Sequence, residues 1–229
     1  MRGLILAFQF MTRLPMPTVG EGRLADAAGW FPLVGLVVGA LVALPLVWIP
    51  DPRLAALLAL VVWVWVTGGM HLDGLADLTD ALGAAHRNRE RFIAVLSDPH
   101  VGSFGVMALV LQLIAKFVLL WLLAEAHAVW WTLPLIAAWA RLGALIWSQS
   151  LPPLKPGLGA QVAGSARRWV SVAWVFLLLW PIALSAFALL WLLAGWAFLR
   201  YRLGGMSGDV LGAGIELVEV GLLLCVLMV

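Results

Sequence analysis

Long apolar runs separated by short polar segments are the feature that most constrains this chain. A helix needs about 20 consecutive apolar residues to cross the hydrocarbon core of a bilayer. Runs that reach or approach this length occupy residues 30–49, 54–70, 105–124, 128–147, 170–199 and 209–229. Hydrophobic residues make up 64% of the 229 residues and charged residues 11%, against about half and about a quarter in soluble domains. The sequence therefore predicts an all-α, polytopic transmembrane helical bundle, with residues 1–229 forming a single integral membrane domain.

The long run at residues 170–199 leaves the number of spans open between six and seven. One tilted helix of about 45 Å and a pair of short helices both fit its length. Because Arg200 and Arg202 follow this run, the positive-inside rule places them with the other basic clusters in the cytoplasm only if the run crosses twice. We therefore predict a hairpin there and seven spans. Residues 1–11 are predicted to form an amphipathic helix at the membrane interface.

Charge and cysteine content exclude two further classes. Fourteen Lys and Arg residues against twelve Asp and Glu residues are nearly balanced, which excludes nucleic-acid binding through a basic domain. The single cysteine, Cys225, allows neither an intramolecular disulfide nor a cysteine-based metal site.

Acidic residues gather in two short segments next to apolar runs. The polar stretch at residues 71–104 is predicted to be a cytoplasmic loop that carries part of the active site. Its acidic stripe, which falls within an arc of about 60° on a helix, consists of Asp73, Asp77 and Asp80. A second stripe, within an arc of about 80°, consists of Asp209, Glu216 and Glu219.

Two interpretations of these stripes compete. Like charges on one helical face are usually just a solvated surface. At the ends of membrane helices, however, ionisable groups are costly and face the bundle interior or a polar cavity. Carboxylates without Cys or His suit Mg²⁺, with Mn²⁺ as an alternative. We favour a metal site shared by both stripes, which indicates phosphoryl transfer because such metals neutralise phosphate charge.

Several residues near the stripes are candidate substrate contacts. Arg87 follows the first stripe, where it fits positive-inside charge equally well. Lys116 and Arg141 lie within apolar runs, and each is either a phosphate contact or the partner of a buried carboxylate. The remaining candidates precede the run at residues 105–124 and are Asp98, His100 and Gly102. Backbone amides at the start of a helix, such as that of Gly102, can bind an anion. His100 next to Asp98 could serve as a general base.

In their order along the chain, these motifs resemble the cobalamin synthase family, adenosylcobinamide-GDP ribazoletransferase. The likeness rests on HLDGLADLTD at 71–80, DPHVGSFG at 98–105 and GGMSGDVLGA at 204–213, with Glu216 and Glu219 following. It is supported by FQFMTRLP at 8–15 and WFPLVG at 30–35.

The resemblance implies a Mg²⁺-dependent enzyme of the bacterial inner membrane, with its active site facing the cytoplasm. A hydroxyl of α-ribazole, or of its 5′-phosphate, would attack the cobinamide-linked phosphate of adenosylcobinamide-GDP. The products would be adenosylcobalamin, or its phosphate, and GMP. The implied partners are these substrates and the lipid bilayer, with no nucleic acid, and a homo-oligomer or an assembly with other cobalamin-pathway enzymes is open.

The resemblance also implies roles for individual residues. Asp73, Asp77 and Asp80 would be catalytic metal ligands, and Asp80 is the candidate base. Further metal ligands would be Asp209, Glu216 and Glu219. Arg13 and Gly208 lie in the matching motifs and join the candidate substrate contacts.

Three other functions compete with this one. A secondary transporter would carry its buried carboxylates near mid-membrane, whereas these stripes lie at helix ends, and no inverted repeat is evident. Another enzyme like the CDP-alcohol phosphotransferases would share the carboxylate spacing, but no Ala-Arg pair follows Asp73 and Gly74. A purely structural membrane subunit would leave both acidic stripes unexplained.

Overall fold

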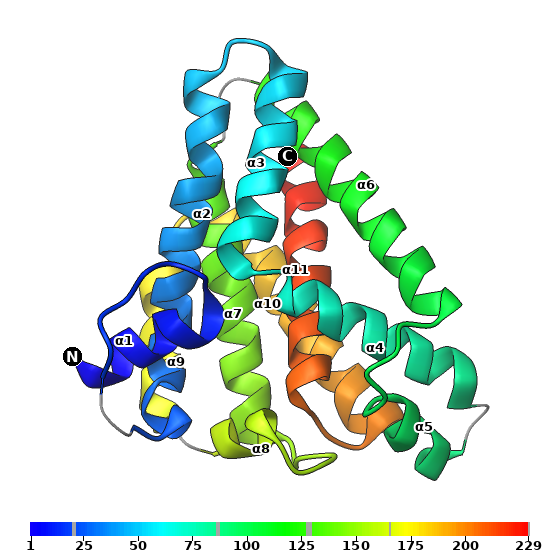
Figure 1. The fold of residues 1–229 in the computed structure, drawn as a ribbon. Coiled ribbons are helices and arrows are strands. Elements are labelled where there is room, and N and C mark those ends of the chain that lie inside the picture. The colour runs from blue at the N-terminus through cyan, green and yellow to red at the C-terminus, as the bar shows by residue number, and fades with distance from the viewer. Residues whose placement is uncertain (20–21, 86–87, 127–129, 165, 229) are drawn as a thin grey trace.

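The computed structural model is an all-helical bundle (Figure 1). It describes all residues except 20–21, 86–87, 127–129, 165 and 229, and the described residues contain no β-strand. The helices of the first half are α1 (Arg2–Met11), η1 (Leu24–Asp26), η2 (Ala28–Trp30), α2 (Phe31–Trp48), α3 (Pro52–Thr67), α4 (Met70–Ala85) and α5 (Arg89–Val95). Those of the second half are α6 (Ser103–Glu125), α7 (Thr132–Ser150), α8 (Leu158–Val162), α9 (Arg168–Leu178), α10 (Ile182–Phe198), the π-helical turn η3 (Leu199–Leu203) and α11 (Gly208–Met228).

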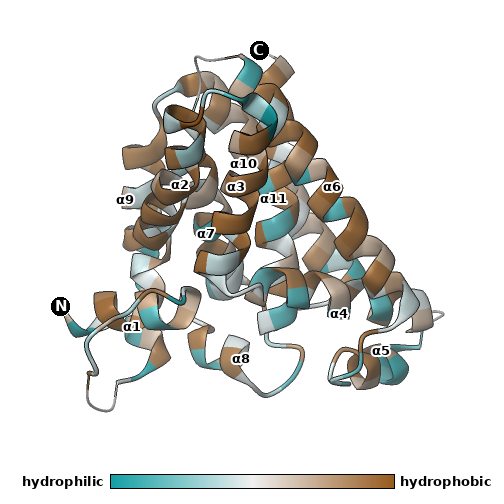
Figure 2. Cartoon of the chain, turned by 45° about the horizontal axis from the view of Figure 1, so that its top comes forward, coloured by the Kyte–Doolittle hydropathy of each residue, from teal (hydrophilic) through white to brown (hydrophobic). Residues whose placement is uncertain are grey.

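Four helical stretches among the described residues are long and apolar enough to cross a membrane. They are Leu24–Trp48, Ser103–Glu125, Ile182–Leu203 and Gly208–Met228. Helices α3 and α4 add a fifth only as a pair bent by 85°. The polytopic helical class is confirmed, and Figure 2 shows apolar residues predominating along these helices. The predicted count of six or seven spans is too high.

The excess in the predicted count has two sources. Helix α7 carries Arg141 and ends in polar residues, and it is largely buried by other helices. The run at residues 170–199 does divide into two helices, as predicted, with Pro181 at the break. However, α9 has only 11 residues and is about 16 Å long, too short for a hydrocarbon core of about 30 Å.

The pair α2–α7 forms the centre of the bundle. Gly35 and Gly39 of α2 lie so close to α7 that a Cβ atom at either would collide with the α7 backbone. The hydrophobic effect does not drive helices together inside a bilayer. Small residues stabilise a helix pair there because they let the two backbones approach closely and make van der Waals contact. The G-x-x-x-G spacing of these two glycines is a sequence signal for such a contact.

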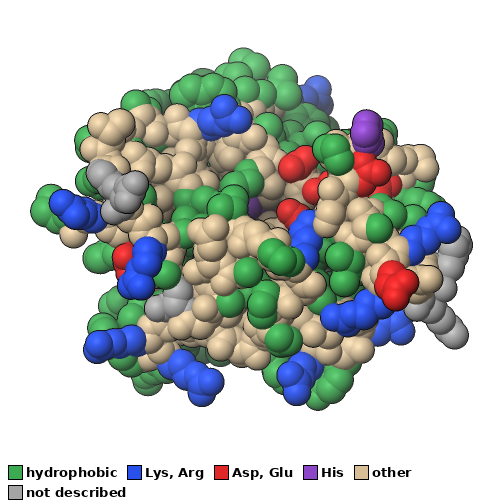
Figure 3. Space-filling model, turned by 60° about the horizontal axis from the view of Figure 1, so that its bottom comes forward, with side chains coloured by type: hydrophobic (Ala, Val, Ile, Leu, Met, Phe, Trp, Pro, Cys, Tyr) green, Lys and Arg blue, Asp and Glu red, His purple; other side chains and the backbone are tan. Residues whose placement is uncertain are grey.

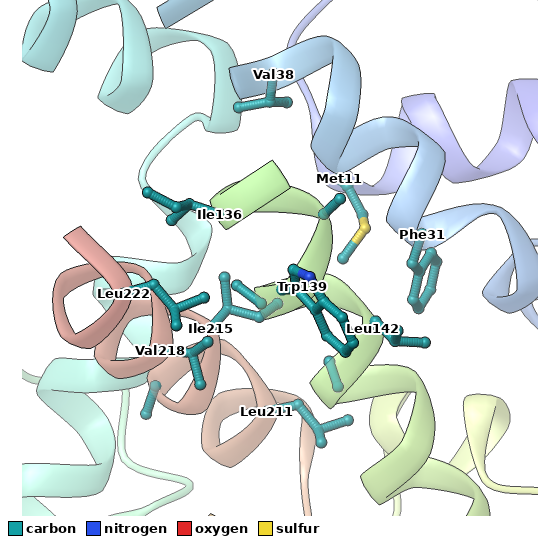
Figure 4. Close-up of a cluster of buried hydrophobic side chains, with 14 of the residues drawn as sticks. Met11, Phe31, Val38, Ile136, Trp139, Leu142, Leu211, Ile215, Val218 and Leu222 are labelled. Carbon is teal, nitrogen blue, oxygen red and sulfur yellow. The ribbon is translucent and has the colours of Figure 1, made fainter. Parts of the chain in front are cut away.

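Buried side chains of α7 also pack against α11. Figure 4 shows Ile136, Trp139 and Leu142 of α7 near an apolar stripe of α11. The labelled members of this stripe are Leu211, Ile215, Val218 and Leu222. Their spacing of three and four residues is that of one helical face, so α11 turns one apolar face to the core.

A sharp turn at Gly68 and Gly69 directs α4 away from α3. Both glycines have positive φ, 64° and 72°, in the left-handed region that favours glycine. The Arg13 side chain fills the space beside Gly68, and the backbone N–H of Arg13 donates to the Val66 carbonyl at 2.7 Å. After this turn, most of the polar stretch at residues 71–104 is helical and forms α4 and α5. Helix α1 also forms, as predicted for residues 1–11. Placement of these parts in the cytoplasm and at the membrane interface stays a prediction.

Candidate active site

Three carboxylates from α4 and α11 meet at one end of the bundle, and we call Asp73, Asp77 and Asp209 the acidic cluster. The two helices approach closely because Gly74 has no side chain and lies against the backbone of Asp209. Asp73 is exposed, whereas Asp77 and Asp209 are half-buried. Burial, followed by the charges of Asp73 and Asp209, raises the pKa of Asp77 to about 6. A bound cation would offset this repulsion between like charges, so the acidic cluster is a place that attracts cations.

A pocket of about 410 Å³ opens beside the acidic cluster. Phe10, Met11 and Phe31 from α1 and α2 form one side of its lining. Residues of α4 and α11, among them His71, Asp73, Asp209, Leu211 and Ile215, also line it, as do residues 155–159. Figure 3 shows the acidic side chains gathered beside a hollow on this end of the molecule. The pocket thus joins an apolar interior to a charged mouth.

Lys155 also lines this pocket, although nothing in its local sequence singles it out beyond its positive charge. Its Nζ lies 2.8 Å from Oδ2 of Asp209 and 3.2 Å from Oγ of Ser97. The loop that carries it is fixed to the start of α11, because the Leu154 N–H donates to the Met206 carbonyl at 2.7 Å. The ammonium therefore stands where a phosphate next to the acidic cluster would need a cation.

Asp80 occupies a different position from the other carboxylates of its stripe. Its side chain is buried, and its two oxygens accept the N–H groups of Gly102 and Gly105 at 2.7 and 2.9 Å. Asp80 on α4 therefore caps the N-terminus of α6. A carboxylate is stabilised there because a helix N-terminus carries partial positive charge. The Gly102 amide is occupied by this bond, so its expected contact with a substrate anion is wrong for this arrangement. A catalytic role for Asp80 stays a prediction.

Asp98 and His100 are brought together, but away from the pocket. The His100 Nδ1 lies 2.6 Å from Oδ1 of Asp98, and both side chains are exposed. The hydrogen bonds from His100 lower the pKa of Asp98. Neither residue is part of the pocket lining, so the pair has no direct contact with that site.

The other two carboxylates of the second stripe belong to a separate group inside the bundle. We call Glu216, Glu219, Lys116 and Arg141 the buried ionic cluster. Lys116 Nζ lies 2.7 Å from Glu216 and 2.6 Å from Glu219, and Arg141 Nη1 lies 2.7 Å from Glu219. All four side chains are at most 3% exposed.

This pairing corrects four predicted roles. Glu216 and Glu219 are neutralised by cations and are therefore not available as metal ligands. Lys116 and Arg141 are partners of buried carboxylates rather than phosphate contacts, which was the alternative left open for them. Glu216 lies seven residues beyond Asp209, or about 10 Å along the helix axis, so a shared helical face does not make a shared site.

The remaining predicted substrate contacts have different positions. Gly208 lines the pocket, whereas Arg13 does not and instead packs against Gly68. Arg87 lies outside the described residues.

The acidic cluster is the candidate metal site in the described part of the chain. No group of three or more His, Cys, Asp or Glu side chains is already arranged there to hold a metal. Mg²⁺, however, usually keeps several waters and is held by one or two carboxylates together with substrate phosphates. Asp73, Asp77 and Asp209 offer such oxygens at a pocket mouth, so these three residues are the candidates for holding such an ion.

Comparison with known proteins identifies the family. The family model described as cobalamin-5-phosphate synthase matches residues 3–227. The chain belongs to the cobalamin-5-phosphate synthase family. A relative from Laribacter hongkongensis is 56% identical, with 98% of this chain and 96% of the relative covered. Relatives from Thiobacillus denitrificans and Novosphingobium aromaticivorans are 52% and 51% identical, with at least 98% of this chain and 94% of each relative covered.

All three relatives are named adenosylcobinamide-GDP ribazoletransferase. No solved structure matches the chain. Membership of the cobalamin-5-phosphate synthase family confirms the resemblance found in the sequence motifs. It makes the protein a transferase of cobalamin biosynthesis, so the transporter alternative is not favoured.

Proposed function

We propose that this protein joins adenosylcobinamide-GDP to α-ribazole, or to α-ribazole 5′-phosphate, and that the reaction takes place at the acidic cluster. The names of the relatives supply the substrates. One observation supports placing the reaction at the acidic cluster. Asp73, Asp209 and Lys155 border the pocket, whose lining is otherwise largely apolar.

In this reaction a hydroxyl oxygen of the acceptor forms a bond to the cobinamide-linked phosphorus. The bond from that phosphorus to the GMP oxygen breaks, and the hydroxyl proton passes to a base. Lys155, whose Nζ is 2.8 Å from Asp209, binds a phosphate oxygen and offsets its charge. Asp73, Asp77 and Asp209 would hold Mg²⁺, or Mn²⁺, which would supply charge neutralisation on the phosphates when bound.

Basic residues support a cytoplasmic position for this end of the bundle, in the inner membrane of a bacterium. Arg89, Arg91, Arg168, Arg200 and Arg202 are exposed, and Figure 3 shows Lys and Arg side chains around the pocket face. Arg53 lies just after the α2–α3 turn, at the far end in Figure 1. This asymmetry is that of the positive-inside rule. A homo-oligomer, or an assembly with other enzymes of the pathway, stays a prediction.

The test is a metal-dependence assay on the full chain in liposomes. Adenosylcobinamide-GDP and α-ribazole are supplied together, and GMP release is followed with EDTA and after addition of Mg²⁺ or Mn²⁺. We expect GMP only with the metal and both substrates. Full activity in EDTA would overturn the metal site, and no GMP from folded protein with either acceptor would overturn the reaction.

A matched pair of variants locates the chemistry. Asp209→Asn removes one charge of the acidic cluster and should lower GMP release at least about 100-fold. Asp26→Asn makes the same chemical change at an exposed carboxylate whose ion pair is with Arg23 at 3.6 Å, and it should leave the rate unchanged. Equal losses in both variants would contradict the assignment.

A further inference from the structure

We infer that the 410 Å³ pocket is the acceptor site, and that His71 and the Phe10–Phe31 wall recognise the base of α-ribazole. This inference rests on the proposed function and assigns one of its two substrates to one cavity.

The size of the pocket is the first argument. Small-molecule sites span about 300–1,000 Å³, so 410 Å³ lies near the lower end of that range. A nucleoside such as α-ribazole fits such a volume. Adenosylcobinamide-GDP carries a corrin macrocycle, an adenosyl group and a nucleotide, and is several times larger. Its corrinoid part therefore stays outside, on the open face beside the acidic cluster.

The lining of the pocket is the second argument. Phe10 and Phe31 stack with ring centroids 5.9 Å apart and an interplanar angle of 23°. Met11 and Met70 add polarisable sulfur to the lining of the same pocket, and thioethers make favourable contacts with aromatic groups. The base of α-ribazole is a benzimidazole, which is flat and mostly apolar, so an aromatic and thioether wall matches it.

His71 provides the third argument, because it is a buried polar side chain without a partner. It lines the pocket and is only 2% exposed. Neither Nδ1 nor Nε2 has a hydrogen-bond partner among the described residues. Arg141, Glu219 and Lys116 are near enough to act on its charge, yet none of them bonds to it. Buried polar groups are nearly always hydrogen-bonded, so His71 has hydrogen-bonding capacity at the pocket that the described residues leave unused.

The chemistry of the base fits that missing partner. A neutral imidazole offers one N–H donor and one acceptor nitrogen. The benzimidazole of α-ribazole is glycosylated at one nitrogen, and its other nitrogen has a free lone pair and no hydrogen. The His71 N–H donates to that lone pair. A base held in this way leaves the ribose hydroxyls for the charged side of the pocket, at Asp73 and Asp209.

The test measures binding of the acceptor alone, so that it does not depend on turnover. Equilibrium dialysis of α-ribazole, or its 5′-phosphate, is carried out on detergent-solubilised full chain without metal or corrinoid. His71→Leu and Phe10→Ala should each weaken binding about tenfold. His71→Gln keeps an N–H donor and should retain tighter binding than His71→Leu, and it serves if the Leu variant does not fold.

A matched control is available on α6. Phe117 is half-buried like Phe10 and pairs with Trp121 at a centroid distance of 6.3 Å, but it does not line the pocket. Phe117→Ala should leave acceptor binding unchanged. Absence of acceptor binding to the parent protein, or equal binding by parent and His71→Leu, would overturn the inference.

Steady-state kinetics on the same preparations separate this inference from the proposed function. The His71→Leu variant should raise the KM for α-ribazole about tenfold and leave the KM for adenosylcobinamide-GDP unchanged. The opposite split in an active enzyme would overturn the acceptor assignment alone. Absence of GMP from the parent protein would instead overturn the proposed function.

Discussion

The acidic cluster and the buried ionic cluster arise from the same kind of sequence and behave differently. Both place carboxylates of α11 beside α4, and both lie next to apolar residues. In the buried ionic cluster, two carboxylates face the two cations Lys116 and Arg141. In the acidic cluster, three carboxylates share one ammonium, that of Lys155. The first group is balanced and closed, whereas the second has negative charge left over at a pocket mouth.

The difference shows that the counter-charge decides the role of a carboxylate. A buried carboxylate is tolerated when its charge is paired and its oxygens are hydrogen-bonded, as Glu216 is by Lys116 and by Gln112 at 2.8 Å. An exposed group of carboxylates with too few cations attracts cations from solution. Each of the four predictions below either removes a counter-charge or removes a carboxylate.

The largest effect is expected where the buried balance is broken. Lys116→Met leaves Glu216 without its cation and should destabilise the protein by about 3–5 kcal/mol, measured by thermal unfolding in detergent. Lys116 lies over the Trp63 ring, 4.3 Å from its centroid. Arg53→Met is the control, since Arg53 lies over the Trp121 ring at 5.0 Å but is exposed. Adding Glu216→Gln to Lys116→Met should restore part of the loss. An equally stable Lys116→Met with a higher substrate KM would restore the phosphate-contact role.

The next effect is on catalysis without loss of stability. Asp73→Asn and Asp77→Asn should each lower the rate of GMP release at least about 100-fold, or about 2.7 kcal/mol of activation free energy. Their unfolding temperatures should not fall, because removing a like charge relieves repulsion. Fully active, folded variants at both positions would remove the acidic cluster from the mechanism.

A smaller effect is expected at Asp80. Asp80→Asn replaces one carboxylate oxygen that accepts an N–H by an amide that donates, and should cost about 2 kcal/mol of stability. The GMP rate per folded molecule should change little, because the α6 cap is structural. A 100-fold slower enzyme with an unchanged unfolding temperature would instead make Asp80 catalytic, as the family resemblance implies.

The smallest effect is a pH dependence. The pKa of Asp77 is about 6 in the folded chain and about 3.9 in an unfolded one, so the folded state binds more protons between these values. Stability therefore falls as pH rises through this window. The penalty is absent below about pH 4 and complete above about pH 6. In EDTA at pH 7, Asp77→Asn should unfold at a slightly higher temperature than the parent protein. At pH 4 the two unfolding temperatures should be equal. Addition of Mg²⁺ at pH 7 should remove the difference between them.

The sequence predicted the helical membrane class and the proximity of Asp73 to Asp77 because both depend on local pattern. Asp73 and Asp77 are four residues apart, and one helical turn brings such residues to one side. Asp209 joins them through α11, which the motif placed at a helix start. For these three residues, periodicity and context were sufficient.

The rest of the site depends on contacts between distant parts of the chain. Lys116 and Glu219 are 103 residues apart, and no local pattern pairs them. Helical angle alone also ignores distance along the axis, so Asp209 and Glu216 were grouped although about two helical turns separate them. Lys155 was missed because its loop has no periodicity. Backbone bonds of Pro152 and Leu154 with Met206 bring this loop to the pocket.

The two glycines at the crossing of α2 and α7 also control how a substrate fits. Phe31 and Ala144 line the pocket, and they are carried by the helices that Gly35 and Gly39 hold in backbone contact. One added methyl group at either glycine has to displace a whole helix, and with it one side of the cavity. The dimensions of the acceptor site are thus set by a gap between two backbones, at positions that no substrate atom touches.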